Sequence, residues 1–497
     1  MATRIDLIIT IALGILAFVL ATVLGSGSQT MLLLGMLGVV TLPIVLWIRN
    51  ADLTSGGVVA LVAFTIPINL DVNLLYRAHT GGAPSITINV TLIALLLFFV
   101  VWIYRSRVDL QINVLRFHRP LCWSVVLLLA VTPLSAINAN DLELVALEWI
   151  RLVFLAIAMM ATMSFQNDRF VRIWIFILSI QVVVQAALAG AQYFTGQTLG
   201  LAIFGEAALI EQRLGVGKVV NRATGTIGHP NILAYFFEIL VPVFLALTLT
   251  RAPIRYRVWY GLACLAGLFG MITTLSRGAW LTVPVSFVIV FFFIVGQKIV
   301  RVRSTVAIAL LGCSLMVPVY FAYPTIEKRF THTDYKSSGS RVPLNKAAWS
   351  LVEEYPWFGV GLNNMAEVFK REDTTGLART FHGVQHVVHN MHLWTWVETG
   401  TLGLLAFTAP FLIAMWTAIK VGSRAPPVPK AILVGLAAGL LAHLIHGMLD
   451  PGFRISLSIS MLVFTSFGLI GHFALTYPIR DGHPQLPSKK IVNHVKE

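Results

Sequence analysis

Long apolar segments recur along almost the whole chain, and they constrain its fold more than any other feature. Most are about 17 to 23 residues long, the length of a helix that crosses roughly 30 Å of hydrocarbon. Of the 497 residues, 57% are hydrophobic and only 12% are charged, with a mean hydropathy of +0.81. This composition lies far from that of soluble globular domains. Because a backbone in lipid must satisfy its own hydrogen bonds, the sequence predicts an all-α integral membrane protein.

The breaks between the apolar runs predict about fourteen transmembrane helices, with twelve as the alternative. The expected spans are 5–25, 31–48, 57–70, 86–104, 120–137, 143–163, 172–190, 231–250, 258–275, 279–296, 304–322, 400–418, 431–448 and 455–477. The first run is long and lacks a small-residue cleavage site, so it is interpreted as a retained span and not as a signal peptide. Cys122, Cys264 and Cys313 lie inside apolar runs without a pattern, which indicates neither a disulfide framework nor a cysteine metal site.

Basic residues predict the orientation, because short loops rich in Lys and Arg stay in the cytoplasm. Every segment on one side of the predicted membrane carries at least one, which makes both termini cytoplasmic. The chain then divides into four parts. These are residues 1–322, with transmembrane helices 1 to 11 and a periplasmic loop at 191–230; a mostly helical periplasmic subdomain at 323–399, before the third-last span; transmembrane helices 12 to 14 at 400–477; and a cytoplasmic basic tail at 478–497.

Two predicted outer segments, 191–230 and 323–399, are far longer than a connector needs to be, which is typical of functional loops. Both carry basic residues, although the rule that places Lys and Arg in the cytoplasm would leave few on the outer side. Arg213, Lys218 and Arg341 are among them. Positive charge kept on the outer face indicates an anionic ligand. The alternative is that long loops translocate regardless of charge and that these side chains are only solvated.

Three short stretches on the outer face carry candidate chemistry. In "NRATGTIGHPN", Arg222 and His229 lie just before an expected helix start that includes Asn231, and free N–H groups at such a start can face a phosphate. Arg277, in "TTLSRGAW", lies in a tight outer turn, where an arginine is either an interfacial anchor or a ligand for substrate. Arg341 lies near the start of a polar amphipathic helix and faces either water or substrate.

Histidines gather in "FHGVQHVVHNMHLWTW", at the mouth of an expected span. His382, His386 and His389 are spaced by four and three residues, which places them on one face of a helix. A metal site fits this spacing, but the stretch has no HExxH pattern and no carboxylate at a ligand spacing. Ordinary interfacial histidines, beside Trp394 and Trp396 as belt residues, are a second interpretation. The third is a catalytic base, because an imidazole titrates near neutrality and can take a proton from a sugar hydroxyl.

Three blocks of the sequence together resemble a known family. They are His389 and Asn390 followed after nine residues by Gly400 and Thr401, "GHPN" at 228–231, and "SRGAW" at 276–280. In type and order they are similar to the motifs of the O-antigen ligases and related O-antigen polymerase-like proteins. The His-Asn block is the most specific of the three, whereas "SRG" alone would be weak.

The resemblance implies a GT-C-like, metal-independent, inverting glycosyltransferase without a cofactor. Such an enzyme transfers O-antigen polysaccharide from undecaprenyl pyrophosphate to a terminal sugar hydroxyl of lipid A core, at the periplasmic face of the Gram-negative inner membrane. By resemblance, His389 is the base, and Arg222 and Arg277 are the pyrophosphate ligands. Further substrate-binding residues are expected to be Arg341, His229, Asn231, Asn390, Arg213 and Lys218. We expect a monomer among membrane lipids, with no nucleic-acid partner. Two spans more than the usual twelve depart from the family pattern.

Two other functions remain open at this point. An O-antigen polymerase would share topology and chemistry but use a growing lipid-linked glycan as its acceptor. A transporter would carry ionisable residues or broken helices near mid-membrane in paired repeats. Glu148, Arg151 and Glu238 are the few such residues in the expected spans, and no repeat is evident.

Overall fold

The computed structural model describes residues 51–69, 71–79, 81–96, 98, 117–165, 167–213, 219–295, 341–371 and 388–478. The predicted spans 5–25, 31–48 and 304–322, both termini, Lys218, His382 and His386 lie outside the described residues. Within the described part the chain is mostly helical, and eight helices are long and apolar enough to cross a membrane. The predicted class, an all-α multi-pass membrane protein, is thereby confirmed. The total of fourteen spans and the GT-C-like arrangement stay predictions.

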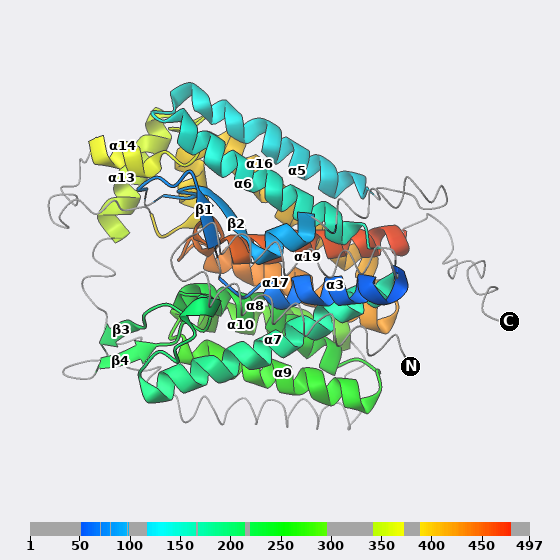
Figure 1. Ribbon diagram of the computed structural model, residues 1–497. Helices are drawn as coiled ribbons and strands as arrows, with labels where there is room; N and C mark the ends of the chain where they lie inside the picture. Colours follow the sequence, from blue (N-terminus) through cyan, green and yellow to red (C-terminus); the bar gives the residue numbers. More distant parts are fainter. Residues whose placement is uncertain are drawn as a thin grey trace.

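The helices run side by side in a bundle (Figure 1). In chain order they are α3 (Ala51–Thr65), α5 (Arg119–Val131) with the 3-10 helix η1 (Thr132–Asn138), α6 (Leu142–Met163), α7 (Asp168–Thr195), the 3-10 helix η2 (Ala202–Phe204), α8 (Pro230–Thr248), α9 (Ile254–Thr273), α10 (Arg277–Val290) with the π-helix η3 (Phe291–Val295), α13 (Arg341–Glu354), α14 (Met365–Arg371), α16 (Met391–Gly422), α17 (Pro427–His446), α18 (Gly452–Ile455) and α19 (Leu457–Thr476). Helices α3 and α9, which correspond to the predicted spans 57–70 and 258–275, are not among the eight.

Two small antiparallel hairpins, which the sequence did not predict, complete the described part. Strand β1 (Asp71–Leu74) pairs with β2 (Ile86–Asn89), and β3 (Ile210–Arg213) pairs with β4 (Val219–Arg222). The predicted span 86–104 therefore begins as a strand and becomes helical only at Val90. Three of the four residues of β2, Ile86, Thr87 and Ile88, are β-branched, which favours a strand over a helix.

Helix α8 lies at the centre of the bundle, and nearly all of its residues are buried. Helix α17 packs against it through two glycines four residues apart. A Cβ atom at Gly439 would lie 2.4 Å from the carbonyl oxygen of Ile239, and one at Gly435 would lie 2.4 Å from the Cα atom of Val243. Small residues at this spacing let two membrane helices approach backbone to backbone. This close contact fixes the end of α17 against the side chains of α8.

Helix α16 begins at Met391, well before the predicted start of its span at residue 400, and it is kinked at Gly400 (φ 65°, ψ −172°). A Cβ atom at this glycine would lie 2.2 Å from the backbone of Trp357. On either side of the kink, the N–H of Gly361 donates to the carbonyl of Glu398 over 3.0 Å, and the N–H of Thr401 donates to the carbonyl of Pro356 over 2.8 Å. The Gly-Thr pair of the His-Asn block thus joins α16 to the turn that follows α13.

The part of α16 before the kink shares a separate small hydrophobic core with α13, α14 and the turn between them. Its buried members are Leu344, Ala348, Leu351, Val352, Val360, Met365, Val368, Val388, Leu393, Trp394 and Val397. The described part of the predicted insertion 323–399 is therefore helical, and its core includes the first turns of α16. The division of the chain at residues 322, 399 and 477 stays a prediction.

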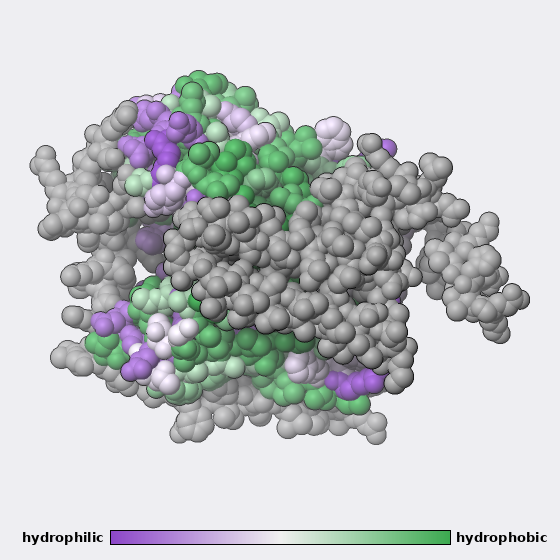
Figure 2. All heavy atoms as spheres, in the orientation of Figure 1, coloured by the Kyte–Doolittle hydropathy of each residue, from purple (hydrophilic) through white to green (hydrophobic). Residues whose placement is uncertain are grey.

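Helices α13 and α14 and the β3–β4 hairpin lie at the same end of the bundle (Figure 1). Figure 2 shows hydrophilic residues gathered over these elements and apolar residues along the visible flanks of the helices. A smaller hydrophilic patch lies at the opposite end. This distribution suits a bundle whose flanks face lipid and whose ends face water.

Candidate active site

Arg222, at the end of β4, ties this strand to two helices. Its Nε donates to the carbonyl oxygen of Thr274, in the turn between α9 and α10, over 2.8 Å. One terminal nitrogen of its guanidinium donates to the side-chain oxygen of Asn231, in the first turn of α8. The side chain is buried, with the whole residue 8% exposed. The predicted residues Arg222 and Asn231 are therefore in direct contact.

His229 is the N-cap of α8, and its Nδ1 accepts the backbone N–H of Asn231 at 3.2 Å. Burial lowers the pKa of His229 to about 4; the carboxylate of Asp450 opposes this shift, and the positive charges of Arg222 and His389 add to it. The imidazole is therefore neutral at physiological pH, so Nδ1 keeps the lone pair that caps the helix. The same interactions bring His229, Arg222 and His389 into one electrostatic neighbourhood.

Asp450, in the turn after α17, is the acidic member of this neighbourhood. Its Oδ2 accepts from the side-chain Nδ2 of Asn231 over 2.7 Å, and its backbone carbonyl accepts from the Tyr235 hydroxyl over 2.6 Å. Oδ1 is buried and has no hydrogen-bond partner among the described residues. Asn231 thus bridges a guanidinium and a carboxylate, with both ends of its carboxamide engaged.

Arg277 is the first residue of α10, directly after the tight turn that Arg222 binds. This turn is strained, because Leu275 has a positive φ of 53°. The Arg277 side chain is half-buried, and no described residue forms a hydrogen bond or an ion pair with its guanidinium. The N–H groups of the first turn of α10 lie beside it. The combination of a guanidinium and a helix N-terminus is suited to an anionic group.

His389 is exposed and lies two residues before the start of α16. The next residue, Asn390, caps the helix: its side-chain oxygen accepts from the N–H groups of His392 and Leu393 over 3.0 and 3.1 Å. The N–H of Met391 donates to the carbonyl of Gly447 over 2.6 Å, in the same turn that carries Asp450. The His-Asn motif therefore combines an exposed imidazole with a cap that fixes the helix behind it.

A buried ion-pair network holds the first turns of α16 in place. Arg454, from α18, pairs with Glu398 at 2.5 Å, with Glu148 of α6 at 3.5 Å, and lies over the ring of Trp394. The other Glu398 oxygen accepts from the indole N–H of Trp394 over 2.7 Å. Arg151 donates to the carbonyl of Phe453 over 2.7 Å. Glu148 and Arg151 are the ionisable residues that the transporter hypothesis would place on a transport path. In the structure, both contact the α18 segment through Arg454 and Phe453.

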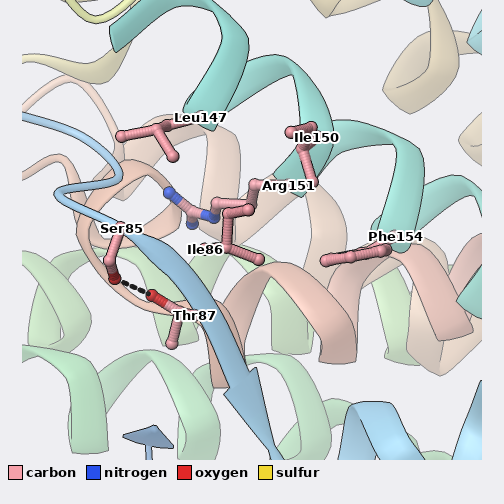
Figure 3. A pocket seen from close by; sticks show the side chains of 7 residues that line it. All are labelled: Ser85, Ile86, Thr87, Leu147, Ile150, Arg151 and Phe154. Atoms are coloured by element: carbon pink, nitrogen blue, oxygen red, sulfur yellow. Dashed lines mark hydrogen bonds between the residues drawn. The ribbon is translucent and has the colours of Figure 1, made fainter. Parts of the chain in front are cut away.

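Arg151 also borders a small pocket between α6 and β2 (Figure 3). Figure 3 shows its side chain extending from α6 toward β2, where the hydroxyls of Ser85 and Thr87 are hydrogen bonded at 3.1 Å. The remaining lining residues are Ile86, Leu147, Ile150 and Phe154. The pocket has room for about one water molecule, so it is too small for a sugar. None of its lining residues is among the predicted site residues.

The other predicted site residues are less fully described. Arg213 pairs through its backbone with Val219 in the β3–β4 hairpin, and Arg341 begins α13, on the same side of the bundle. Among the described residues, no group of three or more His, Cys, Asp or Glu side chains could hold a metal ion. Because His382 and His386 lie outside the described residues, the metal-independent mechanism stays a prediction.

Sequence reasoning did not find Asp450, which binds Asn231, or His446, which pairs with Glu238 at 2.6 Å. Both lie at the end of α17 in "HLIHGMLDP". The partners are 219 and 208 residues away along the chain, so no local pattern could reveal these contacts.

The fold and these contacts define a class: a multi-pass helical membrane protein with a cationic, histidine-containing site at one end of its bundle. Residues 262–408 match the family model of the O-antigen ligases. The match includes Arg277, His389 and Asn390 and confirms the resemblance found in the motifs. Arg222, His229 and Asn231 lie outside the matched segment. A match to this family indicates a glycosyltransferase-like enzyme that acts on lipid-linked glycans in a membrane. No curated protein matches the chain.

Proposed function

We propose that the protein transfers O-antigen polysaccharide from undecaprenyl pyrophosphate to a sugar hydroxyl of lipid A core, at the periplasmic face of the inner membrane. The observation that carries this proposal is the common neighbourhood of Arg222, His229 and His389, beside the turn that leads to Arg277. It supplies cationic groups for a pyrophosphate and an exposed imidazole for a hydroxyl proton. The family match supports the same reaction class.

In the proposed reaction, His389 removes the proton of the acceptor hydroxyl as its oxygen attacks the anomeric carbon of the donor. The bond between that carbon and the pyrophosphate oxygen breaks, so the configuration at the anomeric carbon is inverted. Arg222 and Arg277 neutralise the charge that grows on the departing pyrophosphate. Pyrophosphate with matched charge is a good leaving group, so no carboxylic general acid is required, unlike in glycoside hydrolases.

The neighbours of Arg222 fit this role. Its Nε and one terminal nitrogen are held by Thr274 and Asn231, which fixes the plane of the guanidinium before substrate arrives. Asp450 lies behind Asn231 and balances part of the positive charge. A guanidinium held in this way loses little conformational entropy on binding a phosphate. Asn231 and His229 therefore act in the proposal through Arg222 and the start of α8.

Disruption of the gene tests the function in cells. We expect lipid-linked O-antigen to accumulate at full length beside lipid A core that carries no O-antigen, because polymerisation proceeds and only the transfer is lost. Gel analysis of lipopolysaccharide, together with extraction of the lipid-linked glycan, measures both products. Complementation with the intact gene is the control. Lipid A core bearing a single repeat unit would instead identify a polymerase and contradict the proposed acceptor.

Cysteine labelling at two exposed serines tests the proposed orientation. One serine lies near each end of α16. Ser350 lies in α13, beside the first turns of α16, and Ser423 directly follows its end. In a cysteine-free background, we expect Ser350→Cys to react with a membrane-impermeant maleimide in intact spheroplasts. Ser423→Cys should react only after permeabilisation. The opposite pattern would place the candidate active site in the cytoplasm and refute the proposed periplasmic reaction.

A further inference from the structure

A closed ring of hydrogen bonds lies directly behind the candidate active site. Its members, here called the polar ring, are Arg222, Asn231, Asp450, His446, Ser276 and the Thr274 backbone and hydroxyl. The Asp450 N–H donates to the His446 carbonyl over 3.1 Å, and the Ser276 N–H donates to the Thr274 hydroxyl over 3.3 Å. Two turns of the chain, after α17 and between α9 and α10, are therefore linked on both sides.

His446 is the member of the polar ring that reaches into the bundle. Its Nδ1 donates to Oε2 of Glu238 over 2.6 Å, and its Nε2 lies 3.5 Å from the Ser276 hydroxyl. The second oxygen of Glu238 accepts from the hydroxyl of Thr282 over 2.8 Å. Nδ1 donates its hydrogen bond to the carboxylate, which leaves Nε2 as the ring atom that faces the Ser276 hydroxyl. Glu238 therefore favours a His446 ring with a proton on Nδ1 and fixes the orientation of that ring.

Packing fixes the His446 ring as firmly as its hydrogen bonds do. On one face it stacks on Tyr235, with ring centroids 4.1 Å apart. On another side it touches the first turn of α10, where a Cβ atom at Gly278 would lie 2.1 Å from its Cδ2 and 2.2 Å from its Nε2. The residues on both sides of Arg277, Ser276 and Gly278, thus contact the same imidazole.

A buried imidazole and carboxylate are costly inside a membrane bundle. Glu238 is fully buried, and His446 is 2% exposed. A buried pair of this kind often adds little stability over apolar side chains of similar volume, and ionisable residues inside membrane proteins are usually functional. Neither side chain belongs to the proposed chemistry at His389. Their contacts point to Arg277.

We propose that Glu238 and His446 are positioning residues that set the place of Arg277 through the turn between α9 and α10. This inference rests on the proposed function, because it assigns the pair to the donor pyrophosphate and not to the acceptor hydroxyl. The His446 imidazole packs between α8 and the first turn of α10, and the Glu238 carboxylate fixes the orientation of the ring. Arg222 binds the same turn from the other side, so the two guanidiniums keep a constant separation.

Gly278→Ala is the sharpest test, because the new methyl group must displace the His446 ring. The matched control is Gly261→Ala in α9, where the nearest heavy atom to a new Cβ is at 3.5 Å, an ordinary contact. We expect Gly278→Ala to lower kcat/KM for the lipid-linked donor about 10-fold to 100-fold, the loss typical of a small misplacement of a reacting group. KM for the acceptor should be nearly unchanged. Gly261→Ala should be close to the parent protein.

A second measurement needs no turnover. Hydrogen–deuterium exchange of the purified proteins should be faster at residues 273–281 in Gly278→Ala and unchanged there in Gly261→Ala. Binding of undecaprenyl pyrophosphate in nanodiscs should weaken only in the first variant. If the parent protein does not join glycan to lipid A core, the proposed function fails. Hydrogen–deuterium exchange and donor binding in Gly278→Ala still decide whether Glu238 and His446 position Arg277. Unchanged exchange and unchanged donor binding in Gly278→Ala would overturn it.

Glu238→Gln tests the pair without a change in volume, should Gly278→Ala fail to fold. A glutamine oxygen still accepts from Nδ1, so we expect a loss of kcat/KM under tenfold, whereas Glu238→Leu should lose as much as Gly278→Ala. The pH profile should keep its shape in both variants. A Glu238→Gln protein with normal exchange but no turnover, or with a shifted pH profile, would show that the pair moves protons and would refute a positioning role.

Discussion

Replacing His389 with alanine is expected to reduce transfer about 100-fold to 10,000-fold, the contribution typical of a general base. Donor binding should stay nearly intact, because the base removes a proton from the acceptor and does not hold the pyrophosphate. His389 is exposed beside the neighbourhood of Arg222 and His229, where an acceptor hydroxyl could reach it. Initial rates in a reconstituted assay, together with donor binding, measure the two effects separately.

His392, in the first turn of α16 and three residues after His389, provides the matched control. Its Nε2 is 2.9 Å from the carbonyl of Leu444, so it joins α16 to α17. Glutamine can keep this hydrogen bond, and His392→Gln should therefore retain most of the activity. If His389→Ala keeps a rate near that of the parent protein, the histidines at this helix start are interfacial residues and the base lies elsewhere.

Arg277→Ala and Arg222→Ala are expected to lower kcat/KM for the donor about 30-fold to 1000-fold each. This range corresponds to about 2 to 4 kcal/mol, the loss typical of one charge-assisted contact to a developing anion. Arg222→Ala should have the broader effect, because Arg222 also binds Thr274 and Asn231. Its loss removes the guanidinium donor from the Thr274 carbonyl and from the side-chain oxygen of Asn231. Steady-state kinetics with varied donor and varied acceptor separate donor from acceptor effects.

Lysine should restore only part of the activity at either position, because one ammonium group does not reproduce the paired donors of a guanidinium. Arg424 is the control: it is exposed beyond the far end of α16, and Arg424→Ala should change kcat/KM by less than twofold. Full activity in Arg277→Lys would indicate simple charge attraction. Full activity in Arg277→Ala would remove this residue from the donor site.

The helical membrane class followed from the sequence because apolar length alone decides it, but the start of α16 did not. Thr395, Glu398 and Thr399 interrupt the apolar run and moved the predicted span to residue 400. In the structure both threonine hydroxyls donate to carbonyls four residues earlier, over 2.8 and 2.7 Å, and Glu398 pairs with Arg454. Polar residues that are satisfied in this way do not end a helix, and hydropathy does not register their partners.

The two hairpins were missed because each strand has only four residues. So short a strand gives no periodic signal beside a long apolar run. The β3–β4 hairpin matters most, since it delivers Arg222 to the α9–α10 turn. The sequence predicted an outer segment for Arg222 but indicated nothing about the strand that presents it.

Within the candidate site, the sequence predicted residues of recognisable chemistry but did not predict the residues that contact them. Arg222, His229 and Asn231 lie within ten residues of one another, so a local motif could expose them. Asp450 and His446 reach the same place from the far end of the chain, through the close packing of α17 on α8. Such contacts follow from the tertiary fold and leave no pattern in sequence spacing.

The most direct test of the central claim is reconstitution of the purified protein with a lipid-pyrophosphate-linked glycan and lipid A core, in excess EDTA. Mass spectrometry of the products should show glycan joined to lipid A core, with an equal amount of undecaprenyl pyrophosphate released. In His389→Ala, the initial rate of both should fall at least about 100-fold. Lipid-linked glycans that grow longer while lipid A core stays unmodified would contradict the proposed acceptor. A transfer that stops in EDTA and returns only with a divalent ion would contradict the proposed metal-independent mechanism.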